Sequence, residues 1–409
     1  MRKLTFWLSL VLIFLIPWEG ALVIPALGSL TRVVGLLLAG VWVVSAALEK
    51  RFRQPHVFHG LLFLFILWNA ASLIWTIDVG ETKTQLITYV QLFMVAFILW
   101  DLYTTAKSLS MGLQAFVFGS WVAVGSTIFN FISGRQISLY EFGRFSSTGV
   151  NAADLALILS LSLPVAWQLV ISKQIRLPGK LLLISNAVFI PAAIFAIVLT
   201  ATRTALFTVG IALIYIFFSA RNLGRIPRTV FFLISAAALV LLFSQIPAST
   251  FERLGTTEQS IETIDLGGRV ALWKATLLTF LEYPVFGVGS GALSTVVGGF
   301  AHNTYLSVLA ELGLIGFMLF GSIMAIVLFC VVRQPRDFRT LWIALLVIWS
   351  VGVMTLSWEF RKPTWIFLTW IVIGAGYLKE SKPAMVSQTL FRHRAPGLLQ
   401  AGSRRQGFE

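Results

Sequence analysis

The sequence predicts an all-α integral membrane protein with about twelve transmembrane helices and one long loop, between the ninth and tenth spans, that carries an amphipathic helix. Composition is the first observation, because 57% of the 409 residues are hydrophobic and only 12% are charged, unlike a soluble domain. The second observation is the spacing of the apolar stretches. Apolar stretches follow one another along nearly the whole chain, and about 20 apolar residues cross the roughly 30 Å hydrocarbon layer as a helix.

The predicted spans are, in order, 4–18, 27–48, 57–76, 84–100, 108–132, 152–172, 181–200, 204–219, 229–246, 302–332, 340–358 and 364–378. Residues 1–379 therefore form one polytopic membrane domain. The first span follows Arg2 and Lys3 as a signal peptide does, but no small-residue cleavage site follows Trp18. We expect this span to remain as an anchor.

Basic residues predict the orientation, since Lys and Arg are retained on the cytoplasmic side. With both termini cytoplasmic, 21 of the 31 basic residues lie on the inner face, and every cytoplasmic connection carries at least one. The tail 380–409 is basic and is expected to be disordered. The net charge of +14 thus follows from short loops beside lipid, so membrane lipids rather than nucleic acid are the expected partners. The single Cys330 excludes a disulfide framework within the chain.

Two outer loops, 133–151 and 247–301, are long, polar and rich in glycine, and such loops on a rigid scaffold carry function. The second contains "GGRVALWKATLLTFLEYP", in which Val270, Trp273, Leu277 and Phe280 recur at helical spacing until Pro284. This pattern predicts a helix on the outer membrane surface or over the bundle. Five glycines between Gly287 and Gly299 then allow a tight backbone path toward His302.

Two arginines on the outer face are candidate anion ligands. Arg269 follows Gly267 and Gly268 at the predicted helix start, where free N–H groups and the helix dipole favour an anion such as phosphate. Arg203 lies in the tight connection between the seventh and eighth spans, where a charge is costly unless it faces a cavity or partner. The alternatives are an exposed arginine that only begins a helix and a snorkelling side chain.

Arg144 and His302 are further candidates. Arg144 lies in a turn-rich loop before the sixth span, for which Asn151 or Ser147 is a possible cap, and its charge either joins the anion site or is solvated. His302 is a candidate general base toward a hydroxyl. The alternative is an interfacial histidine beside Asn303, which serves the helix start.

Within the tenth span, Tyr305 shares the helical face of His302, and Glu311 lies roughly 13 Å deeper. A buried carboxylate needs a partner, so we expect Glu311 to lock this span against its neighbours. No outer loop carries an Asp-x-Asp pair, so neither a metal nor another cofactor is predicted. Walker, G-x-S-x-G and H-E-x-x-H patterns are also missing from the sequence.

These residues together resemble a known family. "HNTYLSVLAELGLIG" has His302 and Asn303, nine residues, Gly313, two residues and Gly316, similar to the H-[NSQ]-x9-G-x2-[GTY] motif of the O-antigen ligase and O-antigen polymerase superfamily. Upstream, "GGRVALWKATLLTFLEYPVFGVGSG" is similar to its Arg…Trp…Pro-x-x-G-x-G segment. "FGRFSSTGVNAADLALILSLSLPV" and "LTATRTAL" follow the family order, so the resemblance covers most of residues 140–320.

The resemblance implies a metal-independent glycosyltransferase of the bacterial inner membrane with a periplasmic active site. The implied donor is a glycan on undecaprenyl pyrophosphate, and the acceptor is a sugar of the lipid A core in a ligase or another lipid-linked glycan in a polymerase. It implies that His302 is the base or acceptor-orienting residue and that Arg203 and Arg269 hold the pyrophosphate. Arg144 is our addition to that anion site, with Asn303, Tyr305 and Gly268 in support.

Direct displacement would invert the anomeric centre, because the hydroxyl attacks opposite the leaving group. The spacing of the His302 motif favours a ligase over a repeat-unit polymerase or a protein O-glycosyl ligase. A flippase or transporter would place its substrate site near the midplane and show repeats, which this sequence lacks. A peptidoglycan-type polymerase would need an outer-loop acid, for which Glu258, Glu262 and Asp265 are available.

Overall fold

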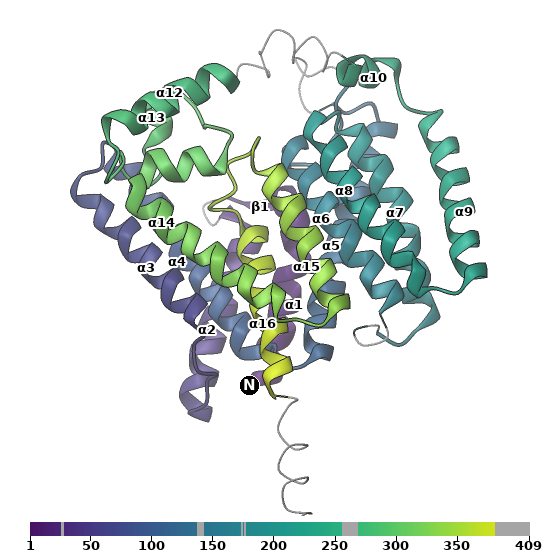
Figure 1. Cartoon of the computed structure of the whole chain (residues 1–409), viewed down its shortest axis with the longest axis horizontal. Coiled ribbons are helices and arrows are strands. Elements are labelled where there is room, and N and C mark those ends of the chain that lie inside the picture. Colours follow the sequence, from purple (N-terminus) through teal and green to yellow (C-terminus); the bar gives the residue numbers. More distant parts are fainter. Residues whose placement is uncertain (26–27, 137–142, 173–174, 176, 256–268, 381–409) are drawn as a thin grey trace, which may run out of the picture.

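The computed structural model describes residues 1–25, 28–136, 143–172, 175, 177–255 and 269–380 and is a bundle of long helices (Figure 1). The helices are α1 (Arg2–Leu15), α2 (Leu30–Glu49), α3 (Val57–Ala71), α4 (Val79–Leu102), α5 (Ala106–Ile132), α6 (Ala152–Ile171), α7 (Lys180–Leu199), α8 (Arg203–Ser219), α9 (Arg225–Phe243), α10 (Ala248–Gly255), α12 (Arg269–Glu282), α13 (Leu293–Val297), α14 (Thr304–Val332), α15 (Arg336–Gly352) and α16 (Lys362–Glu380). Three 3₁₀ turns, Ile16–Ala21, Ser72–Ile74 and Ala220–Asn222, and a hairpin of β1 (Val23–Ile24) and β2 (Gly28–Ser29) complete the described elements.

The predicted all-α membrane class is confirmed. Among the described residues, ten helices are long and apolar enough to cross a membrane: α1 to α9 and α14. The last two predicted spans correspond to α15 and α16, which pack into the same bundle. That α15 and α16 cross the membrane, and so the count of twelve spans, stays a prediction. Which end of the bundle is cytoplasmic and which is periplasmic also stays a prediction. The predicted tail, from residue 381 on, lies outside the described residues.

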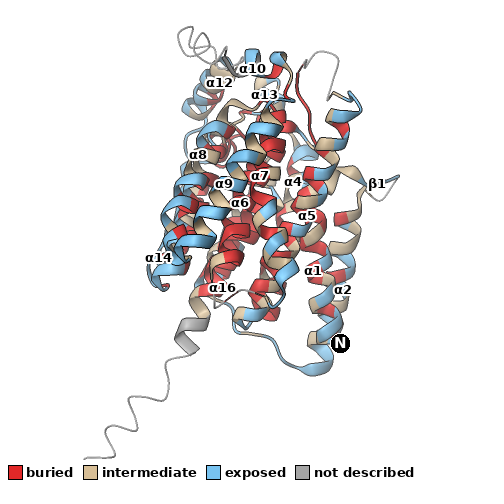
Figure 2. Ribbon diagram, turned by 90° about the vertical axis from the view of Figure 1, so that its right-hand side faces the viewer, coloured by how far each residue is buried: buried red, intermediate tan, exposed pale blue. Residues whose placement is uncertain are grey.

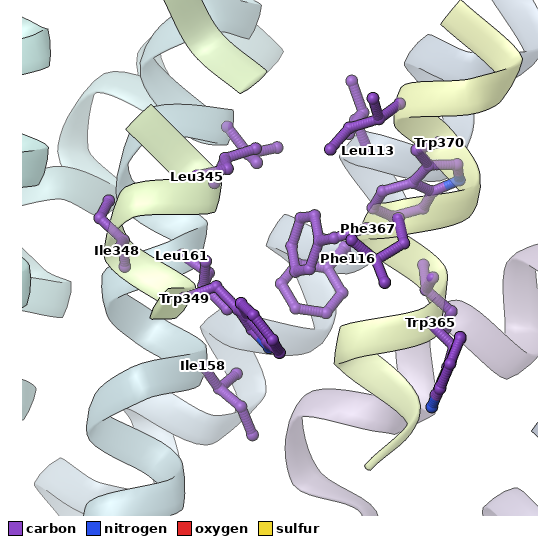
Figure 3. Packing of buried hydrophobic residues seen from close by; sticks show 14 of the residues in the cluster. Leu113, Phe116, Ile158, Leu161, Leu345, Ile348, Trp349, Trp365, Phe367 and Trp370 are labelled. Atoms are coloured by element: carbon purple, nitrogen blue, oxygen red, sulfur yellow. The ribbon is translucent and has the colours of Figure 1, made fainter. Parts of the chain in front are cut away.

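Helix α6 lies at the centre of the bundle, and 89% of its most apolar window is buried. Figure 2 shows buried residues concentrated along the inner helices and exposed ones on the outer surfaces of the bundle. In the core, aromatic side chains of α5, α15 and α16 interlock around α6, as Phe116, Trp349, Phe367 and Trp370 do in Figure 3. This dense packing gives the loops above it a rigid support.

The elements α10, α12 and α13 lie at the same end of the bundle, which we call the α12 end (Figure 1). The chain's N-terminus lies at the opposite end, the N-terminal end. Helix α12 matches the predicted helix and packs over α14 and α13, so it covers the bundle. Its predicted apolar stripe is wrong in part, because Leu277 is 47% exposed while Thr276 and Thr279 are buried. The inner face of α12 therefore meets protein through small hydroxyl side chains.

Helix α14, predicted as one continuous span, is interrupted at Gly313. Its backbone there has φ 63° and ψ −168°, a conformation that glycine alone adopts readily. The helical hydrogen-bond ladder ends at that residue and begins again after it. Backbone groups freed inside a membrane protein must find new partners, because lipid supplies none.

Three carbonyls beside this break have partners outside α14. The carbonyl oxygens of Ala310 and Glu311 accept hydrogen bonds from the backbone N–H groups of Val288 (3.0 Å) and Gly289 (2.9 Å). The Leu312 carbonyl accepts from the Trp68 indole at 2.9 Å. Across the break, the Leu314 N–H donates to the Pro284 carbonyl at 2.9 Å. The segment 284–289 therefore pairs with the interrupted helix and fixes its bend.

Close backbone approach explains the glycines of both segments. A Cβ on Gly313 would lie 2.2 Å from the Val285 carbonyl oxygen, and one on Gly287 would lie 2.3 Å from that of Glu311. The Glu311 carboxylate adds a further tie, since it accepts a hydrogen bond from the Gly291 N–H at 2.7 Å. Glu311 thus has a partner in the glycine-rich segment, as its predicted locking role requires.

We predict that Gly313→Ala lowers the free energy of unfolding by roughly 2 kcal/mol or more, because alanine meets both a backbone collision and a disfavoured conformation. Thermal unfolding of purified protein in detergent measures the loss. Gly321→Ala is the matched control on the same helix, since a Cβ there has no neighbour within 4 Å. Equal unfolding midpoints for the two variants would contradict the paired break.

Candidate active site at the α12 end

Four sequence-predicted residues begin or precede elements that meet at the α12 end. Arg203 is the first residue of α8, and Arg269 is the first residue of α12. Arg144 lies in the loop between α5 and α6, and His302 precedes α14 by two residues. Gly268 lies outside the described residues, as do Glu258, Glu262 and Asp265.

Arg144 is held by the turn between α7 and α8. Its Nε donates to the Thr200 carbonyl at 2.9 Å, and its guanidinium also reaches the Thr202 hydroxyl at 3.5 Å. The next residue, Phe145, donates its N–H to the Leu199 carbonyl at 2.9 Å. Arg144 is only 9% exposed, so the alternative of a solvated loop arginine is wrong. The 143–150 loop and the start of α8 therefore present Arg144 and Arg203 from one place.

The three arginines lie close enough for their charges to act on one another. Partial burial, then the positive charges of Arg144 and Arg203, lower the pKa of Arg269 below its usual range. The Arg269 guanidinium makes no hydrogen bond or ion pair with another side chain in the described part of the chain. Arginine stays protonated despite such a shift. Three gathered cations repel one another, and an anion placed between them would relieve that repulsion.

His302 lies on the edge of this positive field. Burial and the charge of Arg269 lower its pKa, and the charge of Asp154 opposes them in part. The imidazole is therefore neutral at pH 7 and able to accept a proton. Asn303 caps α14, because its side-chain oxygen accepts from the N–H groups of Tyr305 (3.0 Å) and Leu306 (3.1 Å). The helix start thus does not need the His302 side chain.

The backbone of His302 is strained. Its φ of 48° lies in the left-handed region, which a non-glycine residue seldom occupies. Among the described residues, only Lys50 and Ala201 share this property, and Ala201 lies two residues before the start of α8 at the same site. Strain of this kind persists where surrounding structure holds it.

Asp154 is a site residue that sequence reasoning missed. Its carboxylate accepts hydrogen bonds from the Trp358 indole at 2.7 Å and from Arg361 at 3.3 Å. It lies in the first turn of α6, after the cap Asn151, where an acidic residue already has a local explanation in the helix dipole. Trp358 and Arg361 lie in the segment after α15, and only the fold brings that segment to Asp154. Tyr305 lies deeper, with its hydroxyl 3.5 Å from the Ser350 carbonyl.

An apolar groove leaves the site along the surface between α7 and α8. It encloses about 140 Å³ and is lined mostly by aliphatic side chains, such as Ile194, Val198 and Leu206. Gly210 widens it, since a Cβ there would meet nothing within 4 Å. The groove begins at Thr202, whose hydroxyl contacts Arg144. An apolar chain attached to an anion could therefore lie in lipid contact while its charged head reaches the arginines.

Comparison with known proteins finds one family match. Residues 187–321 match the family model described as O-Antigen ligase. The match runs from α7 into α14 and includes Arg203, Arg269 and His302, whereas Arg144 lies before it. A search of curated proteins finds no match to the chain. The resemblance to the O-antigen ligase and polymerase superfamily is thus confirmed.

We predict that the pKa of His302 lies below 6.5, that Arg269→Gln raises it by removing a positive charge, and that Asp154→Asn lowers it by removing a negative one. The measurement is the rate at which diethyl pyrocarbonate modifies His302 at each pH, followed by mass spectrometry of its peptide, because only the neutral imidazole reacts. If both substitutions leave the midpoint unchanged, the three charges do not share one site.

Proposed function

Since the chain carries the domain of the O-antigen ligase and polymerase superfamily, we propose that it is an O-antigen ligase. It transfers a glycan from undecaprenyl pyrophosphate to a sugar hydroxyl of the lipid A core, at the periplasmic face of the inner membrane and without a metal. Members of this superfamily are glycosyltransferase-like enzymes of lipopolysaccharide biosynthesis with lipid-linked glycan substrates. The observation that carries the proposal is the joint placement of three arginines beside a neutral histidine.

The arginines suit the pyrophosphate of the donor. A pyrophosphate gains charge as the glycosyl bond breaks, and fixed guanidinium groups stabilise it most at that moment. Their mutual repulsion in the free protein is what the donor relieves. Arg269 adds the N-terminal dipole of α12, a second source of positive potential. This set of charges allows departure of the leaving group without a divalent cation.

His302 suits the acceptor. In the transfer step the acceptor hydroxyl oxygen forms a bond to the anomeric carbon while the bond from that carbon to the pyrophosphate oxygen breaks. The hydroxyl proton passes to the imidazole of His302, and undecaprenyl pyrophosphate leaves with the bonding pair. Attack opposite the leaving group inverts the anomeric centre. Because burial and then the charge of the nearby Arg269 lower the pKa of His302, the imidazole is unprotonated and ready at neutral pH.

The groove between α7 and α8 supports a polyprenyl-linked donor over a soluble nucleotide sugar. Its aliphatic lining fits an isoprenoid chain, and the contact of its lining residue Thr202 with Arg144 fits a pyrophosphate attached to that chain. A soluble donor would have no use for such a groove. A volume of about 140 Å³ accommodates only the first isoprene units, so the rest of the chain would lie in the bilayer.

The alternative within the superfamily is a repeat-unit polymerase, whose acceptor is another lipid-linked glycan. The ligase is preferred because His302, Asn303, Gly313 and Gly316 keep the spacing typical of ligases. A flippase or transporter has less support, since the candidate residues gather at the α12 end rather than near the midplane.

We predict that His302→Ala lowers the transfer rate by about 10²- to 10⁴-fold, because it removes the proton acceptor. Arg269→Ala should cost about 10²-fold or more through lost stabilisation of the leaving group. Rates are measured on purified variants with a lipid-linked donor. Lys274→Ala, which removes an exposed cation from the same helix, is the control and should keep wild-type activity. Full activity in the His302 or Arg269 variant would exclude that residue from the chemistry.

Deletion of the gene tests the choice of reaction. For a ligase, electrophoresis of the surface glycan should show core without long chains, while lipid-linked polymer accumulates in the membrane. Core bearing a single repeat unit would instead identify a polymerase and refute the ligase assignment. Complementation with the Lys274→Ala gene should restore the wild-type pattern, and complementation with His302→Ala should not.

A further inference from the structure

A second charged cavity lies at the N-terminal end, far from the candidate active site. It is a hollow of about 390 Å³ that is widely open at the surface, and it is lined by Arg2, Lys50, Arg51, Phe52 and Arg53. Four of these five residues are cations, and they come from the start of α1 and the segment that follows α2. We propose that this cavity binds the headgroup of an anionic phospholipid.

One buried carboxylate organises the cavity. Asp101, 2% exposed, accepts hydrogen bonds from the Arg2 guanidinium (3.1 Å), the Arg53 backbone N–H (2.7 Å) and the Trp42 indole (3.0 Å). The Arg53 guanidinium lies 3.6 Å from the centre of the Trp100 ring, and one of its nitrogens donates to the Trp100 carbonyl at 3.4 Å. Arg2 and Arg53 are therefore fixed in place rather than free to move in solvent.

Two cations of the cavity have no acidic partner among the described residues. The oxygens of Asp101 are already occupied by three donors. The nearest acid in sequence, Glu49, is exposed and accepts from the Ser45 hydroxyl at 3.4 Å. Lys50 and Arg51 are exposed beside the cavity, and neither forms an ion pair with a described residue. Both charges are therefore available to a phosphate.

Lys50 occupies its position at a cost. With φ 46° and ψ 33°, it ends α2 in the left-handed conformation that glycine adopts most easily. Lysine here is less stable than glycine would be, unless its ammonium group is used. The partial negative charge at the end of α2 attracts this cation to some extent, but it does not account for Arg51 and Arg2 on the same wall.

The neighbouring surface indicates a lipid rather than a free phosphate. Phe52 in the cavity wall is 63% exposed, and Leu48 and Val44, one and two turns back along α2, are 69% and 48% exposed. Only 17% of the apolar window of α2 is buried, so this face meets acyl chains. A phosphate held by Lys50 and Arg51 would have its acyl chains against Leu48 and Val44.

Native mass spectrometry of the full-length protein in detergent tests this proposal with phosphatidylglycerol, cardiolipin, phosphatidylcholine and inorganic phosphate as separate probes. The two anionic lipids should bind, and Lys50→Ala/Arg51→Ala should weaken them about tenfold or more. Arg221→Ala/Arg225→Ala removes two exposed cations, one from the 3₁₀ turn after α8 and one from the first residue of α9, and should leave binding unchanged. Equal binding of phosphatidylcholine, or no effect of the first pair, would overturn the proposal.

A further variant separates binding from folding. Lys50→Gly removes the cation and also relieves the left-handed strain, so the lipid-free protein should unfold at the same or a higher temperature while its affinity for cardiolipin falls. A fall in both quantities would mean that Lys50 acts in folding, against the proposal. Inorganic phosphate that binds as tightly as the lipids would show that the site takes phosphate itself, also against it.

Discussion

The interruption of α14 at Gly313 is the constraint on which the candidate site depends. Three carbonyls lose their helical partners there, and they regain them from Val288, Gly289 and the Trp68 indole. That pairing requires the segment 284–289 to lie against α14, and the same segment connects α12 to the residues before His302. The bend, the glycine-rich approach and the position of α12 over the bundle therefore form one unit. The two sequence motifs meet in space because their backbones are bonded to each other.

The second organising feature is positive charge gathered at the α12 end. Arg144 and Arg203 are positioned by the turn between α7 and α8, and Arg269 comes from α12 on the other side of the long loop. Their repulsion opposes folding slightly, and an anion bound between them would relieve it. Burial and the charge of Arg269 also lower the pKa of the nearby His302. Under the proposed function, one set of charges thus holds the leaving group and maintains the base.

The helical membrane class and several local features could be predicted from the sequence, because the length of an apolar stretch and the charge of a loop are local properties. Helix α12, the cap Asn303 and the buried Glu311 were predicted in this way. The break at Gly313 was missed, since a glycine within a long apolar run is compatible with a straight helix. Only Pro284, Gly287 and Gly289, considered together with Gly313, carry a signal for the pairing. Asp154 was missed because its partners, Trp358 and Arg361, lie some two hundred residues away in the chain.

The central claim is that this chain catalyses glycosyl transfer at the α12 end. Purified protein in liposomes, supplied with an undecaprenyl-pyrophosphate-linked oligosaccharide and lipid A core, tests it most directly. We expect glycosylated core of inverted anomeric configuration, released undecaprenyl pyrophosphate, and no loss of rate when divalent cations are chelated. Movement of the lipid-linked glycan across the bilayer with no new glycosidic bond would contradict the claim.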